Sequence, residues 1–338
     1  NWKTTLLISN ITNIEDTTNP GFPVMITSAN DLITLYPSDI TTTSPEYIYA
    51  RDFFGAEPTP EYMYVFGEAS GDFTTMLAGL DEIFENQWFH TISTDASVNT
   101  IKQASDFDKA TTNKYVHYFN SDANTTIADN ISNVKQYPIK RGYYIAADVE
   151  PKHVANLVGS RLSLLPGSSP WGALRLQNII PSTYTKAEKL QLVGINRDSS
   201  TGINIVTAEE NIPIVYYGKS MDGITWWDYV LAEIMIDDYL RRGVFEFIVN
   251  TNTGGSKIDA DDIGASLFVA EVTRILDLFV NYNIIYAENE RDANNNKLFS
   301  VRVISIENRE ITLEYEIYLK GAIIKADIKV NLNVINGN

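Results

Sequence analysis

Residues 62–93 read YMYVFGEASGDFTTMLAGLDEIFENQWFHTIS, and this stretch contains a complete strand–helix–strand unit. Residues 62–66 and 88–93 are short segments rich in aromatic and β-branched side chains, which is typical of strands. Between them, apolar residues recur from Phe73 to Phe84 at the spacing of an amphipathic helix, with Asp72 as its N-cap. The unit therefore predicts two parallel strands that are joined by a right-handed crossover helix.

The same alternation continues on both sides of this unit. One helix is predicted to begin at Ser44-Pro45, where Ser caps the free N–H groups and Pro needs no hydrogen bond, and to end at Gly55. Further strands are expected at residues 24–26, 114–119 and 143–147, and further helices at residues 96–107, 127–134 and 154–162. The pattern predicts an α/β fold in which a mixed, largely parallel sheet is flanked by helices.

The second half of the chain has a different pattern. Residues 164–222 are punctuated by Gly, Pro, Ser and Asn and contain only two short predicted strands, at residues 203–206 and 212–217. Two long helices, at about residues 225–242 and 261–280, and an antiparallel hairpin, at residues 299–306 and 310–320, follow. We therefore expect an α+β arrangement in the C-terminal half.

These patterns predict four parts of the chain. They are an N-terminal arm and linker (residues 1–20), an α/β domain (21–165), a C-terminal α+β part with two long helices and a hairpin (166–320), and a C-terminal strand arm (321–338). The N-terminal part carries a short apolar run, Leu6 to Ile8, before the polar stretch NITNIEDTTNPG.

The predicted C-terminal arm shows strict alternation of apolar and polar residues, which indicates a strand with one buried face. A strand at a chain end either closes its own sheet or leaves an unpaired edge that recruits another chain. One interpretation is that this strand extends its own hairpin into a meander, and the other is that it pairs with a neighbouring subunit. The apolar face is formed by Ile324, Ala326, Ile328, Val330, Leu332 and Val334.

Composition limits the partners and the chemistry. The formal charge of −17 disfavours a nucleic-acid or anionic-membrane partner, because both require clustered Lys and Arg. The absence of cysteine removes disulfides, thiolate metal sites and thiol nucleophiles, and is compatible with a reducing cytoplasm. No apolar run reaches the length of about 20 residues that a membrane span requires, and no signal-peptide pattern is present.

The search for a catalytic site finds no convincing motif. The three histidines, His90, His117 and His153, have no metal-ligand spacing and are expected to serve packing. The loop Gly67–Asp72 lacks the P-loop and dinucleotide-binding signatures, and the turn that begins at Asp292 lacks the Gly and Glu of a calcium loop. We therefore expect no enzymatic activity, no cofactor and no metal.

Five segments, taken in order, resemble the contractile tail sheath proteins of bacteriophages, in particular the compact sheath-like family. They are NPGFPVMIT (19–27), SPEYIYARDFFGAEPTPEYMYVFG (44–67), LPGSSPWGALRLQNIIPSTYT (165–185), the stretch from Ile212 to Asn250, and YLKGAIIKADIKVNLNV (318–334). The chain departs from the family pattern before its last long helix, where SKIDADD replaces a Pro-Tyr-Thr-Asp type of turn, and in its short N-terminal arm.

The resemblance implies a structural subunit that polymerises into stacked hexameric rings around an inner tube and contracts to drive the tube into a target cell. It also implies that arms from both chain ends complete a small sheet in a neighbouring subunit, which assigns an N-terminal contact to Thr4, Leu6, Leu7 and Ile8. The implied partners are further copies of the chain, a tail tube protein, and baseplate and tail terminator proteins. The implied location is the tail of a virion assembled in the host cytoplasm.

Two other classes of function stay open from the residues alone. One is an α/β enzyme or nucleotide-binding module that oligomerises through its terminal strand, with a ligand pocket at the carboxyl ends of the strands. The other is a different tail component, such as a tube or baseplate protein, or the corresponding part of a tail-like bacteriocin or injection system. Arg241, Arg242 and Arg274 on the two long helices are candidates for tube or neighbour contacts, although a solvated helix face is the favoured interpretation.

Overall fold

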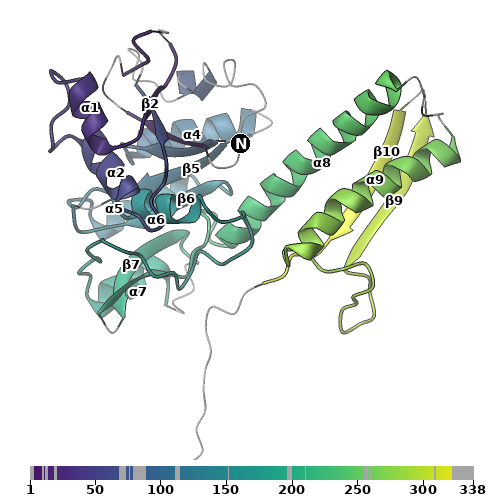
Figure 1. The fold of residues 1–338 in the computed structure, drawn as a ribbon. Coiled ribbons are helices and arrows are strands. Elements are labelled where there is room, and N and C mark those ends of the chain that lie inside the picture. The colour runs from purple at the N-terminus through teal and green to yellow at the C-terminus, as the bar shows by residue number, and fades with distance from the viewer. Residues whose placement is uncertain are drawn as a thin grey trace, which may run out of the picture.

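The computed structural model of the chain shows a large sheet unit and a smaller C-terminal unit that a long helix joins to it (Figure 1). The residues that the structure describes are 4–9, 11, 14–18, 21–67, 74–75, 77–78, 89–110, 115–150, 152–195, 200–209, 211–254, 258, 261–307 and 310–321.

The sheet unit is built on eight strands in the order β2-β3-β1-β4-β5-β6-β7-β8. Strands β3, β1, β4, β5, β6 and β7 run parallel, whereas the edge strands β2 and β8 pair antiparallel with β3 and β7. The predicted mixed, largely parallel sheet is therefore confirmed. The strands are β1 (Thr4–Ile8), β2 (Val24–Ile26), β3 (Met63–Phe66), β4 (Phe89–Ser93), β5 (Tyr115–Asn120), β6 (Gly142–Ala146), β7 (Ile203–Glu209) and β8 (Ile212–Tyr216).

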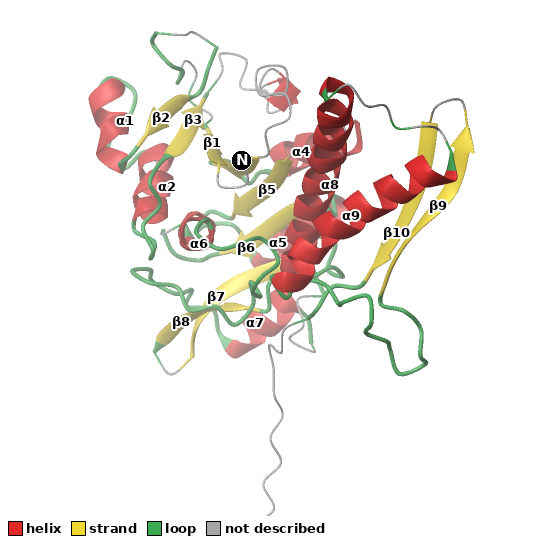
Figure 2. Ribbon diagram, turned by 45° about the vertical axis from the view of Figure 1, so that its right-hand side comes forward, coloured by secondary structure: helices red, strands yellow, loops and turns green. Residues whose placement is uncertain are grey.

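Helices cover both faces of this sheet (Figure 2). Helices α1 (Ala29–Leu35), α2 (Pro45–Phe54) and α6 (His153–Arg161), together with the start of α8, share one buried apolar cluster with the sheet. Helices α4 (Val98–Ala110), α5 (Ile127–Gln136) and α7 (Lys186–Val193) share a second cluster with the opposite face. The parallel strands are thus buried on both sides, which is how parallel sheets satisfy their apolar surface.

The C-terminal unit consists of two long helices and a hairpin. These are α8 (Trp227–Thr253), α9 (Asp262–Asn281), β9 (Phe299–Glu307) and β10 (Glu310–Ile317), and they enclose a third apolar cluster. The side chain of Asp261 accepts a hydrogen bond from the backbone of Gly264 and so caps α9, as its sequence position predicts. At 1.5 Å per residue, the 27 residues of α8 span about 40 Å.

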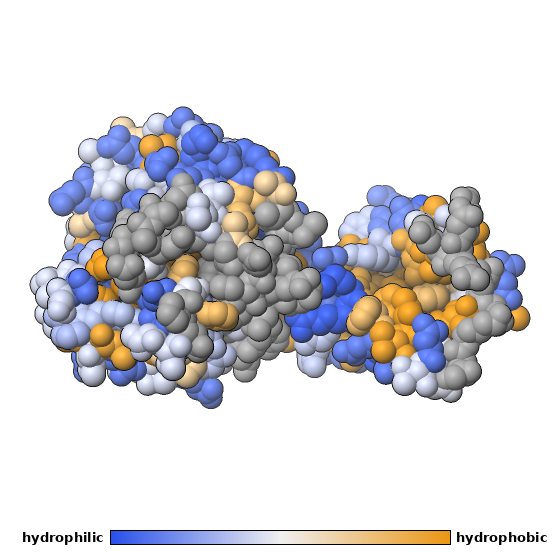
Figure 3. Space-filling model, turned by 90° about the horizontal axis from the view of Figure 1, so that it is seen from above, coloured by the Kyte–Doolittle hydropathy of each residue, from blue (hydrophilic) through white to orange (hydrophobic). Residues whose placement is uncertain are grey.

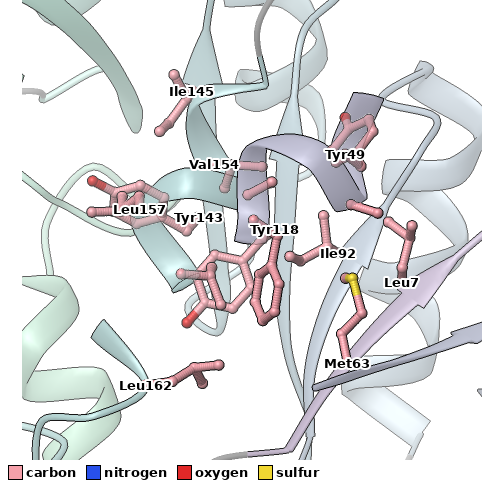
Figure 4. Close-up of a cluster of buried hydrophobic side chains, with 14 of the residues drawn as sticks. Leu7, Tyr49, Met63, Ile92, Tyr118, Tyr143, Ile145, Val154, Leu157 and Leu162 are labelled. Atoms are coloured by element: carbon pink, nitrogen blue, oxygen red, sulfur yellow. The ribbon is translucent and has the colours of Figure 1, made fainter. Parts of the chain in front are cut away.

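An aromatic cluster anchors the first turn of α8 in the sheet unit. Trp227 is fully buried, and its ring lies 5.3 Å from the ring of Tyr118, 5.1 Å from Tyr143 and 6.2 Å from Trp171, measured between centroids. Tyr118 and Tyr143 come from the centre of the sheet and lie among its largest buried side chains (Figure 4). Edge-to-face and offset ring contacts of this kind stabilise beyond the apolar area that they bury.

The N-terminal residues lie in a different place from the one predicted. Thr4, Leu6, Leu7 and Ile8 form β1, which pairs with β3 on one side and β4 on the other and is buried throughout. The prediction of an N-terminal arm at these residues is therefore corrected. The physical reason is that a central parallel strand is apolar on both faces, so TTLLI shows no alternation and resembles an isolated apolar run.

The boundary between the two units also differs from the predicted one. Strands β7 and β8 belong to the same sheet as β1–β6, so the sheet unit continues past residue 165 to the start of α8. Helices α1 and α7 were not predicted, and the predicted strand at residues 24–26 is β2, an edge strand of the sheet. Of the helix predicted from Phe73 to Phe84, the four described residues (74, 75, 77 and 78) are helical, and the others lie outside the described residues.

Replacing Trp227 with Ala tests the aromatic anchor. The substitution removes a fully buried indole and leaves a cavity among three other rings, so we expect the free energy of unfolding to fall by about 3–5 kcal/mol. Urea unfolding followed by circular dichroism measures this loss. The matched control is Phe245→Ala on the same helix, where the ring is 66% exposed and the change should stay within about 0.5 kcal/mol. Equal losses of stability in both variants would contradict the role of Trp227 as the anchor of α8.

Candidate assembly interface

The C-terminal hairpin is a sheet of two strands in the described part of the chain. β9 and β10 pair antiparallel, with Phe299 opposite Ile317 at one end and Glu307 opposite Glu310 at the other, which confirms the predicted hairpin. Two strands alone are marginally stable in water. Each open edge also carries a row of backbone N–H and C=O groups with which an added strand can pair.

One face of the hairpin packs against the core of its own unit. Phe299 is buried, and Val301, Leu313, Ile317 and Leu319 pack against the apolar cluster formed by α8 and α9. This packing fixes the position of the hairpin, because α9 lies across that face. An incoming strand can therefore join the hairpin only at its edges, where it would continue the same apolar face.

The opposite face of the hairpin is polar and exposed. Arg302 on β9 forms an ion pair with Glu314, its cross-strand neighbour on β10. With both side chains at least half exposed, the pair contributes little stability, but it keeps this face soluble. A register shift between Thr312 and Leu313 leaves Ile304 as an additional residue on β9, with its side chain 54% exposed. Bulges of this kind twist an edge and limit indiscriminate pairing.

At the base of the hairpin, backbone hydrogen bonds join its end to the segment that follows α9 in the same chain. The backbone N–H of Tyr286 donates to the carbonyl of Tyr318 (3.1 Å), and that of Lys320 donates to the carbonyl of Ile284 (2.8 Å). Gly321 lies against the hydroxyl of Tyr229 in the first turn of α8. The chain thus leaves the hairpin beside the junction between the two units.

The predicted C-terminal strand, with Ile324, Ala326, Ile328, Val330, Leu332 and Val334, lies outside the described residues. The predicted N-terminal contact residues, Thr4, Leu6, Leu7 and Ile8, lie inside the sheet unit. Of the predicted assembly interface, therefore, the edges of the hairpin are the part that lies within the described residues.

Exposed apolar side chains gather on the outer half of the C-terminal unit, near the turn between α8 and α9. The surface is more apolar here than over most of the sheet unit seen in the same view (Figure 3). We call these residues the α8–α9 apolar strip: Phe245, Ile248 and Val249 on α8, and Ile263 and Leu267 on α9. The exposed fractions of Phe245 and Ile263 are 66% and 74%. Exposed apolar side chains gathered on one part of the surface are typical of interaction sites in soluble proteins.

The arginines on the long helices are engaged in ion pairs along their own helices. Arg241 and Arg242 both contact Asp238, at 3.2 and 2.9 Å, and Arg274 contacts Glu271 at 2.6 Å. These are spacings of three and four residues on one helix face, the pattern of a solvated surface. The arrangement agrees with the favoured interpretation of these arginines from the sequence.

The three histidines are buried and hold structural hydrogen bonds. His90 Nδ1 lies 2.8 Å from the Tyr118 hydroxyl, His117 Nδ1 lies 2.7 Å from Thr91 Oγ1, and His153 Nε2 lies 2.7 Å from the Ile180 carbonyl. Burial lowers the pKa of His117 to about 3 and that of His153 to about 4. Both imidazoles are therefore neutral at pH 7, and each lies in a strand or helix within the packed sheet unit.

A shallow groove between α5 and α7 lies where the alternative of a nucleotide-binding module predicts a ligand pocket. Its two carboxylates are already used by the fold. Asp148 accepts hydrogen bonds from the backbone N–H (2.9 Å) and the hydroxyl (2.7 Å) of Thr183, and Glu188 completes a capping box with Thr185. Asp292 is likewise satisfied within its own turn by Asn294 and Asn296, which supports a polar turn rather than a calcium loop.

Within the described residues, no group of three or more His, Cys, Asp or Glu side chains is arranged to hold a metal ion. The helices in the same part of the chain include none with the length and apolar composition of a membrane span.

Comparisons with known proteins connect this fold to contractile particles. No protein-family model matches the chain, and no curated protein matches its sequence. Among solved structures, a chain of the 6-fold symmetrised baseplate of the anti-feeding prophage is similar, with a TM-score of 0.71 at 11% identity over 99% of this chain and 94% of that chain. A chain of the contracted helical sheath of the same prophage gives 0.68 at 12% identity, over 98% and 93%.

A sheath tail protein from Listeria innocua is also similar, with a TM-score of 0.58 at 9% identity over 92% of this chain and 94% of that protein. The likeness extends over nearly the whole of each chain, so it includes both the sheet unit and the C-terminal unit. The chain therefore has the fold of contractile tail sheath proteins. The family resemblance inferred from five short segments is confirmed at the level of the fold.

The lowered histidine pKa values predict an acid-sensitive stability. A histidine held neutral in the folded state contributes nothing above its unfolded pKa of about 6.5, but it destabilises the fold as the pH falls below that value, because only the unfolded chain takes up the proton. For one such group the loss reaches on the order of 2 kcal/mol at pH 5.

His153→Gln isolates this contribution, because the Gln amide keeps a donor for the Ile180 carbonyl and does not titrate. Urea unfolding at pH 7 and pH 5 should show a smaller loss of stability in the variant than in the wild type. The comparison between the two proteins cancels opposing groups, such as Asp228, whose pKa burial raises to about 6. An unchanged pH dependence in the variant would contradict a neutral, buried His153.

Proposed function

We propose that the chain is a structural subunit of a contractile tail sheath and that it polymerises by adding a strand from one subunit to the β9–β10 hairpin of the next. The observation that carries this proposal is the hairpin itself, which among the described residues is a two-stranded sheet with unpaired edges, in a chain that has the sheath fold. The alternating segment from Ile324 to Val334 supplies a strand of the appropriate pattern.

The apolar face of that strand matches the face that the hairpin already presents to its core. Phe299, Val301, Leu313 and Ile317 alternate along β9 and β10 toward α9. A strand added in register would lay its own alternating aliphatic residues on the same side and its Lys, Asp and Asn residues on the solvent side. The sheet would gain strands without exposing new apolar surface.

The expected strength of one link is moderate. About six backbone hydrogen bonds contribute on the order of 1 kcal/mol each, and each buried aliphatic side chain contributes about 1.5–3 kcal/mol. Ordering a terminal segment offsets much of this gain. Many equal links around a ring and along a stack give a strong assembly although each link is individually weak.

The geometry of the link determines the form of the assembly. A donor strand and an acceptor hairpin are different surfaces, so each subunit gives to one neighbour and receives from another. Such head-to-tail contacts close into rings or continue as open helices. We propose stacked hexameric rings around an inner tube, with a tube protein, a baseplate and a tail terminator as further partners, in the tail of a phage particle or of a related injection system assembled in a host cytoplasm.

Subunits linked in this way can move during contraction without separating. The hairpin packs along α8, a helix of about 40 Å whose first turn is anchored in the sheet unit. We propose that sheet units rotate and slide past one another while the strand links at the hairpins persist. Chains that contract only after releasing their C-terminal strands would contradict this part of the proposal.

Truncation tests the strand link. A chain that ends at Gly321 lacks the proposed donor strand but keeps all of the described hairpin, so we expect it to fold and to lose polymerisation. Negative-stain electron microscopy should show tubes or ring stacks for the full chain and single particles for the truncated chain. The matched control ends at Val334, which removes only the four residues INGN and should assemble as the full chain does.

The truncation experiment contradicts the proposal in two ways. If the chain that ends at Gly321 still forms tubes, the C-terminal strand is not the link. If it loses its native circular dichroism spectrum, the strand belongs to the core of its own subunit.

Charged substitutions test the α8–α9 apolar strip as a second contact between subunits. Phe245→Asp with Ile263→Asp places two carboxylates on surface that a neighbour would cover, so we expect the urea midpoint of the monomer to stay the same and assembly to weaken at least tenfold in critical concentration. Ile224→Asp, at a 79% exposed position in the sheet unit, is the control and should assemble normally. Light scattering against protein concentration measures the difference, and unchanged assembly of the double variant would exclude the strip.

A further inference from the structure

The last described residues of the chain are fastened to the segment that follows α9. Leu319 forms an antiparallel bridge with Ile285, and the backbone hydrogen bonds on either side of this bridge join residues 318–320 to residues 284–286. Ile285 is fully buried, and Leu319 packs against the apolar cluster of the C-terminal unit. The path of the main chain is therefore fixed up to the point at which the C-terminal segment begins.

The side chain of Lys320 adds three contacts to this attachment. Its Nζ lies 3.2 Å from Asn283 Oδ1, 3.5 Å from Glu290 Oε2 and 5.1 Å from the centroid of the Tyr286 ring. An ammonium group donates to amide and carboxylate oxygens and is attracted to the face of an aromatic ring. The side chain of Lys320 is only 25% exposed, so it lies along this surface. We call these four residues the Lys320 clamp.

The residues that receive the lysine are held in place by other contacts. The carboxylate of Glu290 accepts a hydrogen bond from the backbone N–H of Ala287. Asn283 has a left-handed φ of 60°, and the N–H of the next residue, Ile284, donates to a carbonyl group in the last turn of α9 (2.9 Å). The lysine therefore meets a surface that the rest of the C-terminal unit has already formed.

The clamp lies on the β9 side of the chain. In an extended strand, the N–H and C=O groups of one residue point to the same edge. Tyr318 donates its N–H to the carbonyl of Leu298, immediately before β9 (3.1 Å), and accepts at its own carbonyl from the N–H of Tyr286 (3.1 Å). The segment that carries the clamp thus continues the β9 side of the hairpin past the end of β10.

Helix α8 lies on the other side of the chain. In both views β10 lies between β9 and α8 (Figures 1 and 2). Burial, and then the charges of Asp237 and Glu233 on α8, raise the pKa of Tyr315 on β10, as expected for a strand that runs beside this helix. Just past the end of β10, Gly321 lies against the hydroxyl of Tyr229 in the first turn of α8. The chain end is therefore bounded by the clamp on one side and by Tyr229 on the other.

These two boundaries bear on the two ways in which the C-terminal strand can pair. To extend its own hairpin, the segment that begins at Ile324 must reverse direction within residues 321–323 and return along the edge of β10 that faces α8. A reversal this short requires a tight turn directly after Lys320 and a free path beside the strand. Tyr229 lies beside that path, and the clamp holds the chain on the β9 side. Pairing with a neighbouring subunit requires no such reversal.

We propose that Lys320 is a positioning residue for strand exchange: together with Tyr229 it keeps the C-terminal strand from folding back onto its own hairpin, and so leaves the strand available to a second copy of the chain. The proposal rests on the strand link proposed above and determines whether that link forms within one chain or between two. A strand that folds back is withdrawn from assembly, and the apparent affinity between subunits falls in proportion to the fraction withdrawn.

Hydrogen exchange in the full chain, diluted until it is monomeric, tests this proposal. In the wild type, the amides of residues 324–334 should exchange at close to the rate of an unstructured peptide, because the strand has no partner in a monomer. Lys320→Met keeps a stem of similar length without the ammonium, and Tyr229→Ala opens the path beside α8. In the double variant, we expect these amides to exchange about threefold or more slowly and the critical concentration for assembly to rise by at least the same factor.

Two single variants separate positioning from a general effect on stability. Lys320→Arg keeps a cation at the clamp and should retain wild-type exchange and assembly. Lys297→Met removes an exposed lysine from the turn that precedes β9 and should do the same. The urea midpoint of the monomer should be unchanged in both.

Two outcomes would overturn the proposal. One is a wild-type monomer in which the amides of residues 324–334 are already protected, and the other is a double variant in which they stay unprotected. A wild-type chain that never polymerises would instead contradict the proposed function. The exchange rates are measured in the monomer, so they are read independently of that outcome.

Discussion

The structure depends most on how the start of α8 is held in the sheet unit. Trp227 is enclosed by Tyr118, Tyr143 and Trp171, and the next apolar residues of α8 complete the core on that face of the sheet. About two turns later the same helix leaves the sheet and packs into the core of the C-terminal unit, through residues such as Met235 and Ile236. A single continuous helix therefore belongs to two apolar clusters and joins the two units.

The hairpin shows how an open sheet edge can be kept ready for a partner without causing aggregation. Its apolar face is covered by α9, its other face carries the ion pair between Arg302 and Glu314, and a bulge at Ile304 twists the edge. The net charge of −17 adds a general repulsion between copies. Specific pairing then requires a strand with the correct alternation, which is the role that we assign to the C-terminal segment.

The sequence predicted the architecture wherever the pattern of apolar residues was periodic. The parallel strands β3 to β6, helices α2, α4, α5, α6 and α9, and the C-terminal hairpin all lie close to their predicted positions. Helix α8 begins where predicted but continues to Thr253, 11 residues beyond its predicted end at residue 242. Strand β1 was misread because a strand buried on both faces has no period. Helix α7 was missed although its sequence contains a capping box, formed by Thr185 and Glu188. Ser28 and Asp31 give the same signal at the start of α1, which was also missed. Which face of the hairpin α9 covers depends on packing between segments that are distant in the sequence, which no local pattern encodes.

Cysteine cross-linking provides the most direct test of strand addition between subunits. The chain contains no cysteine, so a pair introduced at Lys329, on the polar face of the C-terminal strand, and at Ser300 or Ser305, on the polar face of β9, reports only on the proposed contact. Under oxidising conditions, strand addition between subunits predicts a ladder of covalent dimers, trimers and longer species on a denaturing gel, absent from each single-cysteine chain beyond the dimer. A cross-link confined to single chains would show that the strand folds back onto its own hairpin and would contradict the account.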